Sequence, residues 1–307
     1  MNRRDFLRRS ALLLATGWLA RAARAMPAPA APTETLGSFQ PLRRNTGYFT
    51  GRGGTIGWLA DPAALVVVDT QFPDTAACCL AGLPGRGDRR LDAVLNTHHH
   101  RDHTSGNGVF QPVARTLVAQ ANVPRLQLAA AVRDGTETSQ VFANETFPEY
   151  WRREIGDEVV SAQYFGAAHT SGDAVVHFER ANVVHMGDLV FNRMYPVIDR
   201  PAGGRVRHWI AALEEAVQTY PKDAIYLYGH GNPKFGVSGR QADLLVFRDY
   251  LTAVLGHVQK GIAAGRSKPE IVALENLPGF ADFHAPAPNR LAGNLEVAYD
   301  ELTEAGG

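Results

Sequence analysis

The sequence contains little cysteine. Cys78 and Cys79 are the only cysteines among 307 residues, and they are adjacent in the segment DTAACCLAGL. Neighbouring cysteines have poor geometry for a disulfide and lack the spacing of zinc ligands, so we predict that both are small core residues on a helix. A disulfide framework and a cysteine-based metal site are therefore excluded. Any metal must be held by histidine and carboxylate side chains.

An excess of basic charge is also absent. The whole chain has 31 basic and 31 acidic residues, and residues 1–25 hold six of the basic ones and one of the acidic ones. The remainder has 25 against 30, a formal net charge of −5. No basic stripe is left to follow a phosphate backbone, which predicts no nucleic-acid partner. An apolar share of 45% with 20% charged residues is typical of a soluble globular protein.

Residues 1–25 have the features of an export signal. Their apolar stretch ALLLATGWLA is well short of the ~18 residues that a membrane-spanning helix needs. The opening RRDFL resembles the twin-arginine export signal, and the closing ARA is a small-x-small cleavage pattern. We therefore expect a signal peptide over 1–25, a flexible Pro- and Ala-rich tether over 26–38 and one folded domain over 39–307. This organisation predicts a periplasmic or secreted protein with no stable membrane insertion after cleavage, and an uncleaved N-terminal anchor is the alternative.

The folded part alternates short β-like runs with helical segments. Strands are expected at 47–51, 54–61, 64–70, 91–97, 116–120, 161–166, 174–180, 182–188 and 224–229. Helices are expected at 73–83, 123–132, 209–220, 240–264 and 291–304. Strand groups separated by helices indicate an α/β layered domain. The polar and aromatic stretch 134–158 is expected to be a loop or lid, with Tyr150 and Trp151 as lid residues or buried anchors.

Polar residues with metal-binding side chains directly follow four of the predicted strands. They are His98, His100, Asp102 and His103 after the first strand, then His169, Asp188 and His230 after the other three. Ligands and catalytic groups collect at the carboxyl ends of strands in layered α/β proteins, because a rigid sheet anchors the loops there. The four strand ends therefore predict one shared metal site.

Alternation along an extended chain separates the candidate ligands from their neighbours. His98, His100 and Asp102 share one face, whereas His99 should point away from them. By the same argument His185 and His177 are strand side chains and not obvious ligands. Glycines on both sides of His230 indicate close backbone approach to another group.

Other polar residues near these strand ends have less specific patterns. Asp69 and Asp173 are expected to be turn residues, while the loop 192–207 has residues that either line a cleft or make ordinary loop contacts. These are Arg193, Tyr195 and Asp199.

The ordered series His98-x-His100-x-Asp102-His103, then His169, Asp188 and His230, resembles the motifs of the metallo-β-lactamase fold hydrolases. The resemblance extends from the strands near residue 47 to the helices after His230. It implies a four-layer αβ/βα sandwich with a two-metal site between two sheets. Carried over residue by residue, one metal would be held by His98, His100 and His169, the other by Asp102, His103 and His230, and Asp188 would bridge them.

The residue at position 188 refines the resemblance. Members of the fold that hydrolyse β-lactams have cysteine or serine there, whereas aspartate is similar to the glyoxalase II, lactonase and phosphodiesterase branches. The resemblance therefore implies a dinuclear hydrolase of an ester, thioester, lactone or related small molecule, acting through a metal-bridging hydroxide. Asp102 is the candidate residue to orient the hydroxide or relay its proton. Histidine with carboxylate suits two divalent ions, Zn²⁺ first, with iron or manganese as alternatives.

Three other functions fit parts of this pattern. A β-lactam-hydrolysing enzyme is one. The second is a sulfur dioxygenase-like iron enzyme, because His98, His169 and Asp188 form a two-histidine, one-carboxylate set of the kind that holds non-haem iron. The third is a non-catalytic periplasmic metal-binding accessory protein. The pattern leaves the oligomeric state open.

Overall fold

The computed structural model describes residues 36–304 of the chain. The predicted signal peptide and all but the last three residues of the predicted tether lie outside the described residues. The first strand begins at Ser38, where the predicted tether ends. Among the described helices, none combines the length and apolar character that crossing a bilayer requires.

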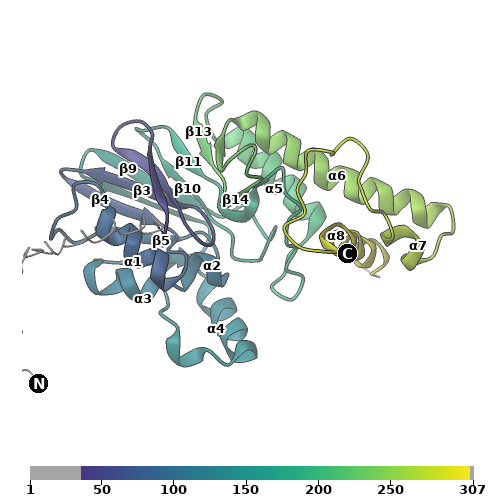
Figure 1. Cartoon of the computed structure of the whole chain (residues 1–307), viewed down its shortest axis with the longest axis horizontal. Coiled ribbons are helices and arrows are strands. Elements are labelled where there is room, and N and C mark those ends of the chain that lie inside the picture. Colours follow the sequence, from purple (N-terminus) through teal and green to yellow (C-terminus); the bar gives the residue numbers. More distant parts are fainter. Residues whose placement is uncertain (1–35, 305–307) are drawn as a thin grey trace, which may run out of the picture. The chain divides into compact units, whose positions relative to one another are not determined.

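Two β-sheets form the centre of the described domain (Figure 1). The first has seven strands in sequence order: β1 (Ser38–Pro41), β2 (Thr46–Thr50), β3 (Ile56–Asp61), β4 (Ala64–Val68), β5 (Ala93–Asn96), β6 (Leu117–Gln120) and β7 (Glu145–Phe147). The second has six strands, in spatial order β15 (Ser238–Gly239), β13 (Ile225–Leu227), β11 (Val183–His185), β10 (Val175–Phe178), β9 (Glu158–Gln163) and β8 (Tyr150–Ile155). A short parallel pair joins β12 (Phe191–Asn192) to β14 (His230–Gly231).

Helices flank both sheets. They are α1 (Pro73–Gly82), α2 (Arg101–Thr104), α3 (Asn107–Phe110), α4 (Val123–Asp134), α5 (Val206–Thr219), α6 (Gln241–Ala263), α7 (Lys268–Val272) and α8 (Arg290–Thr303), with single 3-10 turns η1 (Gln111–Val113), η2 (Glu137–Ser139) and η3 (Gly187–Leu189). The longer helices agree with the predicted ones to within about three residues, which is the usual accuracy of a boundary.

Apolar side chains on both faces of each sheet create the layers. All five residues of β4, ALVVV, are buried, because alternate side chains face the second sheet on one side and α1 on the other. Cys79 on α1 is fully buried in the latter core, as its small apolar character predicts. The outer face of the second sheet packs Val184 and Tyr226 against residues of α5, α6 and α8, among them Trp209. The order helix, sheet, sheet, helix is the predicted four-layer αβ/βα sandwich.

The prediction of a loop or lid over 134–158 was wrong. The segment contains η2, β7 and β8, and β8 is an edge strand paired with β9. Trp151 and Ile155 are buried in the core between the two sheets, whereas the three charged residues between them are exposed. Charged side chains are common on edge strands because they discourage pairing with another chain, and here they hid the strand pattern. Tyr150 is exposed and Trp151 is buried, so Trp151 is an anchor and not a lid residue.

A buried carboxylate stabilises the β8–β9 and β10–β11 connections of the second sheet. Glu158 is 2% exposed and accepts hydrogen bonds from the backbone N–H groups of Val159, Arg180 and Ala181 at 2.7–2.9 Å. We expect Glu158→Ala to lower the free energy of unfolding by about 2–4 kcal/mol, because it leaves buried donors without an acceptor. Its neighbour Asp157, 73% exposed, makes only surface ion pairs.

The control for this prediction is Asp157→Ala, which should cost less than about 1 kcal/mol. Urea unfolding of the two variants checks the comparison. Equal losses would show that Glu158 is no more important to folding than a surface carboxylate.

Candidate metal centre

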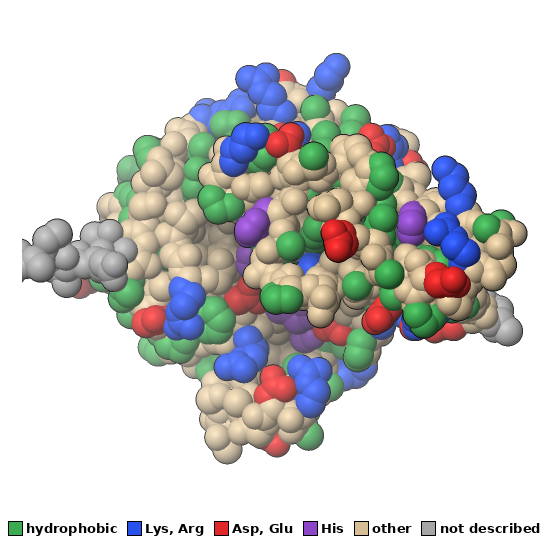
Figure 2. Space-filling model, turned by 45° about the vertical axis from the view of Figure 1, so that its right-hand side comes forward, with side chains coloured by type: hydrophobic (Ala, Val, Ile, Leu, Met, Phe, Trp, Pro, Cys, Tyr) green, Lys and Arg blue, Asp and Glu red, His purple; other side chains and the backbone are tan. Residues whose placement is uncertain are grey.

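The predicted strand-end residues converge at one end of the two sheets. His98 follows β5, His100 is the residue before α2, and Asp102 and His103 lie within α2. The other three come from the second sheet and the β12–β14 pair: His169 from the loop after β9, Asp188 from η3 after β11, and His230 from β14. Figure 2 shows histidine side chains gathered with acidic side chains in a recess on one face of the molecule.

The first group of candidate ligands consists of His98, His100, His169 and Asp188. Their nearest nitrogen and oxygen atoms all lie within 4.8 Å of one another. Nε2 of His169 is 3.0 Å from Nδ1 of His100 and 3.5 Å from Oδ2 of Asp188. Nε2 of His98 is 3.8 Å from the same Asp188 oxygen. These spacings suit ligands that share one ion with metal–ligand bonds of about 2.0–2.2 Å.

The second group consists of Asp102, His103 and His230, again within 4.8 Å of one another. Oδ2 of Asp102 is 3.1 Å from Nε2 of His230 and 3.6 Å from Nε2 of His103. Asp188 also faces this group, with Oδ1 at 3.1 Å from Nε2 of His103 and Oδ2 at 3.5 Å from Nε2 of His230. The carboxylate of Asp188 therefore lies between the two groups.

Two buried atoms of the site fit a cation. Nε2 of His98 and Oδ1 of Asp188 are buried and have no hydrogen-bond partner of acceptable geometry in the described part of the chain. Burying polar atoms without partners is costly, and nearly all such atoms in folded proteins have one. Both atoms can act as metal ligands and both face the other candidate ligands. The residues present therefore fit a metal site.

The two groups of candidate ligands differ in the charge of their histidines near neutral pH. Burial, helped by His103, holds the pKa of His98 well below its usual value, and burial with His100 lowers the pKa of His169 to about 4. Both imidazoles are therefore neutral and offer lone pairs near neutral pH. Burial also opposes the charged form of His230, but the carboxylates of Asp188 and Asp102 outweigh it and raise its pKa to about 9. A cation that binds His230 at neutral pH must therefore release a proton.

Asp69 contacts a candidate ligand, which its sequence pattern did not predict. It was predicted to be a turn residue after β4, and it does adopt a left-handed conformation with φ of 65°. Its buried carboxylate accepts hydrogen bonds from the backbone N–H and hydroxyl of Thr97, and it lies 2.7 Å from Nδ1 of His103. This contact fixes the ring of His103 so that Nε2 faces Asp188. The available signal was that Asp69 follows a buried strand, as Asp188 does.

Asp199 supports a second ligand. Its Oδ2 is 2.8 Å from Nε2 of His100, which leaves Nδ1 of His100 directed at His169. The sequence left open whether Asp199 lines a cleft or makes ordinary loop contacts, and the structure shows it in contact with a candidate ligand. Arg193 pairs with Asp243, and Tyr195 is buried in an aromatic stack, so neither approaches the ligands.

Glycine allows the backbone to approach the ligands closely, as the sequence around His230 predicted. A Cβ atom at Gly229 would overlap Oδ1 of Asp188, and one at Gly54 would overlap the ring of His103. Gly187 has φ of 51°, and a side chain there would collide with Thr97. Replacing any of these glycines would therefore displace a candidate ligand or the turn that holds it.

The three histidines that alternation separated from the ligands, His99, His177 and His185, lie outside the two groups. His185 is buried, and its Nε2 lies 3.1 Å from the backbone oxygen of Thr55 while its Nδ1 accepts from the backbone N–H of Gly187. His177 is a partly buried strand residue next to Tyr220. His99 faces Asp199 and a separate cavity. Asp173 accepts hydrogen bonds from the backbone and hydroxyl of Thr170, which is the predicted role in a turn.

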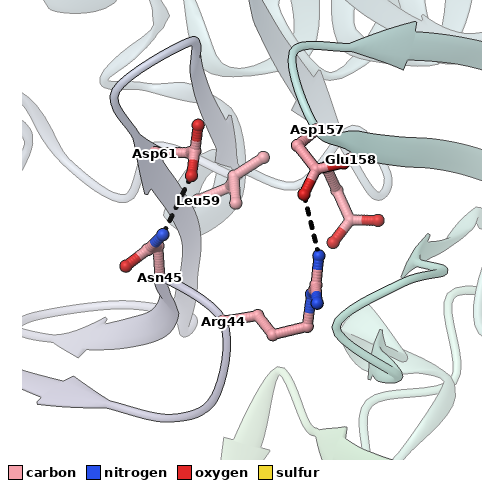
Figure 3. Close-up of a pocket in the computed structure, with 6 residues that line it drawn as sticks. All are labelled: Arg44, Asn45, Leu59, Asp61, Asp157 and Glu158. Atoms are coloured by element: carbon pink, nitrogen blue, oxygen red, sulfur yellow. Dashed lines mark hydrogen bonds and ion pairs between the residues drawn. The ribbon is translucent and has the colours of Figure 1, made fainter.

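A pocket of about 230 Å³ lies at the opposite end of the sheets (Figure 3). The direction of β3 places it there, because Thr55 at the start of this strand bonds to Gly229 beside His230, whereas Asp61 at its end lines the pocket. Asp61 accepts from Asn45, and Asp157 pairs with Arg44. The carboxylates that line this pocket already have protein partners, and none lies near the candidate ligands.

Comparison with known proteins identifies the family. The family described as the metallo-beta-lactamase superfamily matches residues 49–230 of the chain. The chain belongs to the metallo-beta-lactamase superfamily. The matched region extends from β2 to His230 and contains all seven candidate ligands.

Solved structures of the superfamily share the fold. A stereoselective inverting sec-alkylsulfatase from Pseudomonas sp. is 14% identical, with a TM-score of 0.66 over 86% of this chain and 50% of its own. A metallo-beta-lactamase from Pontibacter korlensis is 18% identical, with a TM-score of 0.59 over 70% of this chain and 99% of its own. This chain therefore spans about half the length of the alkylsulfatase. At these identities the similarity shows the metallo-beta-lactamase fold alone.

A curated relative matches a shorter region. The sulfate-binding protein of Salmonella typhimurium is 28% identical over 110 residues, which are 36% of this chain and 32% of that protein. The chain thus spans about a third of that relative's length. Both the family match and the solved structures cover a much larger part of the chain.

Proposed function

We propose that this superfamily member is a dinuclear metal-dependent hydrolase of a small ester, thioester, lactone or related substrate. The observation that carries the proposal is the position of the Asp188 carboxylate, whose two oxygens face both groups of candidate ligands at 3.1–3.8 Å. Two divalent ions held by these groups, Zn²⁺ by preference, would supply a hydroxide nucleophile at neutral pH and polarise the substrate oxygen.

The exposure of the ligands indicates the side from which a substrate approaches. Asp188, His98, His103 and His169 are buried, whereas side-chain exposure is 29% for Asp102 and 22% for both His100 and His230. Substrate therefore enters over the face formed by the three partly exposed residues. Asp102 is the acidic group on this face, and we assign to its carboxylate the role of accepting a proton from the nucleophile and passing it to the leaving group.

Three contacts hold the imidazole rings of candidate ligands in the orientation that metal binding needs. Asp69 holds His103, Asp199 holds His100, and the backbone oxygen of Val197, 2.9 Å from Nδ1 of His169, holds the third ring. Contacts of this kind set the tautomer of a histidine and the direction of its free nitrogen. The three rings are thereby preorganised toward Asp188 before any substrate binds.

A substrate panel tests the proposed reaction class. Protein purified without added metal should hydrolyse at least one ester, thioester or lactone, lose that activity on dialysis against a chelator, and recover it with Zn²⁺. An oxygen electrode in the same assays distinguishes hydrolysis from iron-dependent oxidation, and β-lactams are included as the family alternative. Oxygen uptake with a thiol substrate, without hydrolysis of any panel member, would overturn the proposal.

Export is a further part of the proposal. It rests on residues 1–25, whose RR pair and ARA ending have the pattern of a twin-arginine signal. A fusion of residues 1–38 to a reporter should reach the periplasm, and replacing Arg3 and Arg4 with Lys should retain it in the cytoplasm. Unchanged export of the Lys variant would contradict the twin-arginine route.

A further inference from the structure

A carboxylate of the C-terminal helix α8 binds the start of α5. Glu301 is 7% exposed, and its two oxygens accept hydrogen bonds from the backbone N–H groups of Val206 at 2.7 Å and Arg207 at 3.0 Å. These are the first two residues of α5, and the residue before them makes no side-chain cap. The region that the family matches ends at residue 230, so α8 lies beyond it. A helix outside the matched region therefore supplies the negative group that the N-terminus of α5 needs.

The segment 199–206 connects this contact to the candidate ligand His100. Within the segment, the backbone N–H of Gly204 donates to the backbone oxygen of Asp199 at 2.7 Å, and the N–H of Ala202 donates to Oδ1 of Asp199 at 3.1 Å. The other carboxylate oxygen, Oδ2, lies 2.8 Å from Nε2 of His100. The fold of the segment therefore sets the direction of the carboxylate that holds His100.

The same segment packs on the backbone around His169. The N–H of Asp199 donates to the backbone oxygen of His169 at 3.2 Å, and the N–H of Arg205 donates to that of Ala168 at 2.9 Å. The approach is close, because a Cβ atom at Gly204 would lie 2.7 Å from the oxygen of His169. A shift of the segment would therefore disturb the surroundings of two ligands of the first group.

We infer that Glu301 is a positioning residue of the metal centre. By binding the first N–H groups of α5 it fixes one end of the segment 199–206, and the fixed segment directs Asp199 at His100. Residues that contact metal ligands affect affinity by about 10–100-fold, and Glu301 acts one step further away, so we expect an effect of about three- to tenfold. This role rests on the metal centre of the proposed function and not on the reaction.

The effect should be confined to the first group of candidate ligands. Among the described residues, no hydrogen bond joins the segment 199–206 to Asp102, His103 or His230. Asp69 holds the ring of His103 independently of α8. Loss of the Glu301 contact should therefore weaken the binding of one metal ion and leave the second group unaltered.

Glu301→Gln tests this role with little change of shape. The amide oxygen can accept from one backbone N–H group, but the amide NH₂ faces the other and the negative charge is lost. Competition with a chromophoric chelator should show about three- to tenfold weaker binding of one Zn²⁺ equivalent, and Co²⁺ absorption should change for that equivalent alone. Amide hydrogen exchange of the metal-loaded protein should become faster over residues 199–207. Unchanged affinity and exchange would overturn the assigned role.

Asn294→Ala is the matched control for a general effect of α8 on folding. Asn294 lies on the same helix, is 2% exposed, and donates from Nδ2 to the hydroxyl of Tyr250 on α6 at 2.8 Å. Its replacement loosens α8 from α6 but leaves the contact with α5. We expect a lower thermal unfolding temperature with metal affinity and exchange of the segment unchanged. Equal weakening of metal binding in both variants would show that α8 supports only the fold.

A double variant tests whether Glu301 acts through Asp199. Asp199→Asn alone should weaken metal binding by about 10–100-fold, because it removes the charge beside His100. Adding Glu301→Gln to that variant should cost less than about twofold more, since residues that act through one contact are not additive. Independent, multiplying losses would overturn the route through Asp199. None of these measurements uses a substrate, so a protein that hydrolyses no member of the panel still tests the role of Glu301.

Discussion

Asp188→Asn is expected to abolish measurable hydrolysis and to lower metal content below two ions per chain. The amide has nearly the same shape as the carboxylate, but it lacks the negative charge that faces four histidines at 3.1–3.8 Å. Changes to residues that only support metal ligands cost about 10–100-fold in affinity or activity, and Asp188 faces both groups directly, so a larger loss is expected. Elemental analysis and kcat/KM of the same preparation measure the effect.

The control for this variant is Asp61→Asn. Asp61 bonds to Asn45 at the opposite end of the sheets and should leave both metal content and rate unchanged. Retention of two ions and of the wild-type rate in Asp188→Asn would show that the carboxylate between the groups has no role in holding metal. Thermal unfolding of both variants establishes that any loss is not a loss of fold.

Asp69→Asn is expected to weaken metal binding at the second group by about 10–100-fold while the protein remains folded. Asparagine tolerates the left-handed backbone at this position, and its amide oxygen can still accept from the N–H of Thr97. It provides no negative charge for the Nδ1–H of His103, so the direction and basicity of that ring are no longer fixed. Competition with a chromophoric chelator measures the affinity of the weaker ion.

The matched control is Asp92→Asn. Asp92 belongs to the same sheet region and accepts from the backbone N–H of Leu65, but it contacts no histidine. Its replacement should leave metal affinity unaltered. Equal affinities for wild-type and Asp69→Asn protein would mean that Asp69 is only the turn residue that the sequence suggested.

The fold and the candidate ligands could be predicted because both depend on local pattern. Buried strands such as ALVVV are continuous apolar runs, and the ligands directly follow such strands, so their common location follows from the sheet. Alternation alone separated His99 and His185 from the candidate ligands, and both lie outside the two groups of those ligands.

The supporting residues could not be predicted because they depend on contacts between distant segments. Asp69 reaches His103 across the pairing of β4 with β5, and Asp199 reaches His100 from a loop 99 residues away. Neither contact leaves a spacing that can be read along the chain. The strand β8 was missed for a different reason, because its exposed charged residues interrupt the apolar alternation that marks a strand.

Stepwise reconstitution of the apoprotein tests whether Asp188 holds two ions in one working site. Metal is removed by chelation, Zn²⁺ is returned in known equivalents, and bound metal and hydrolytic rate are measured at each step. We expect the rate to rise until two tight equivalents are bound and no further. Full turnover with a single ion per chain would contradict it.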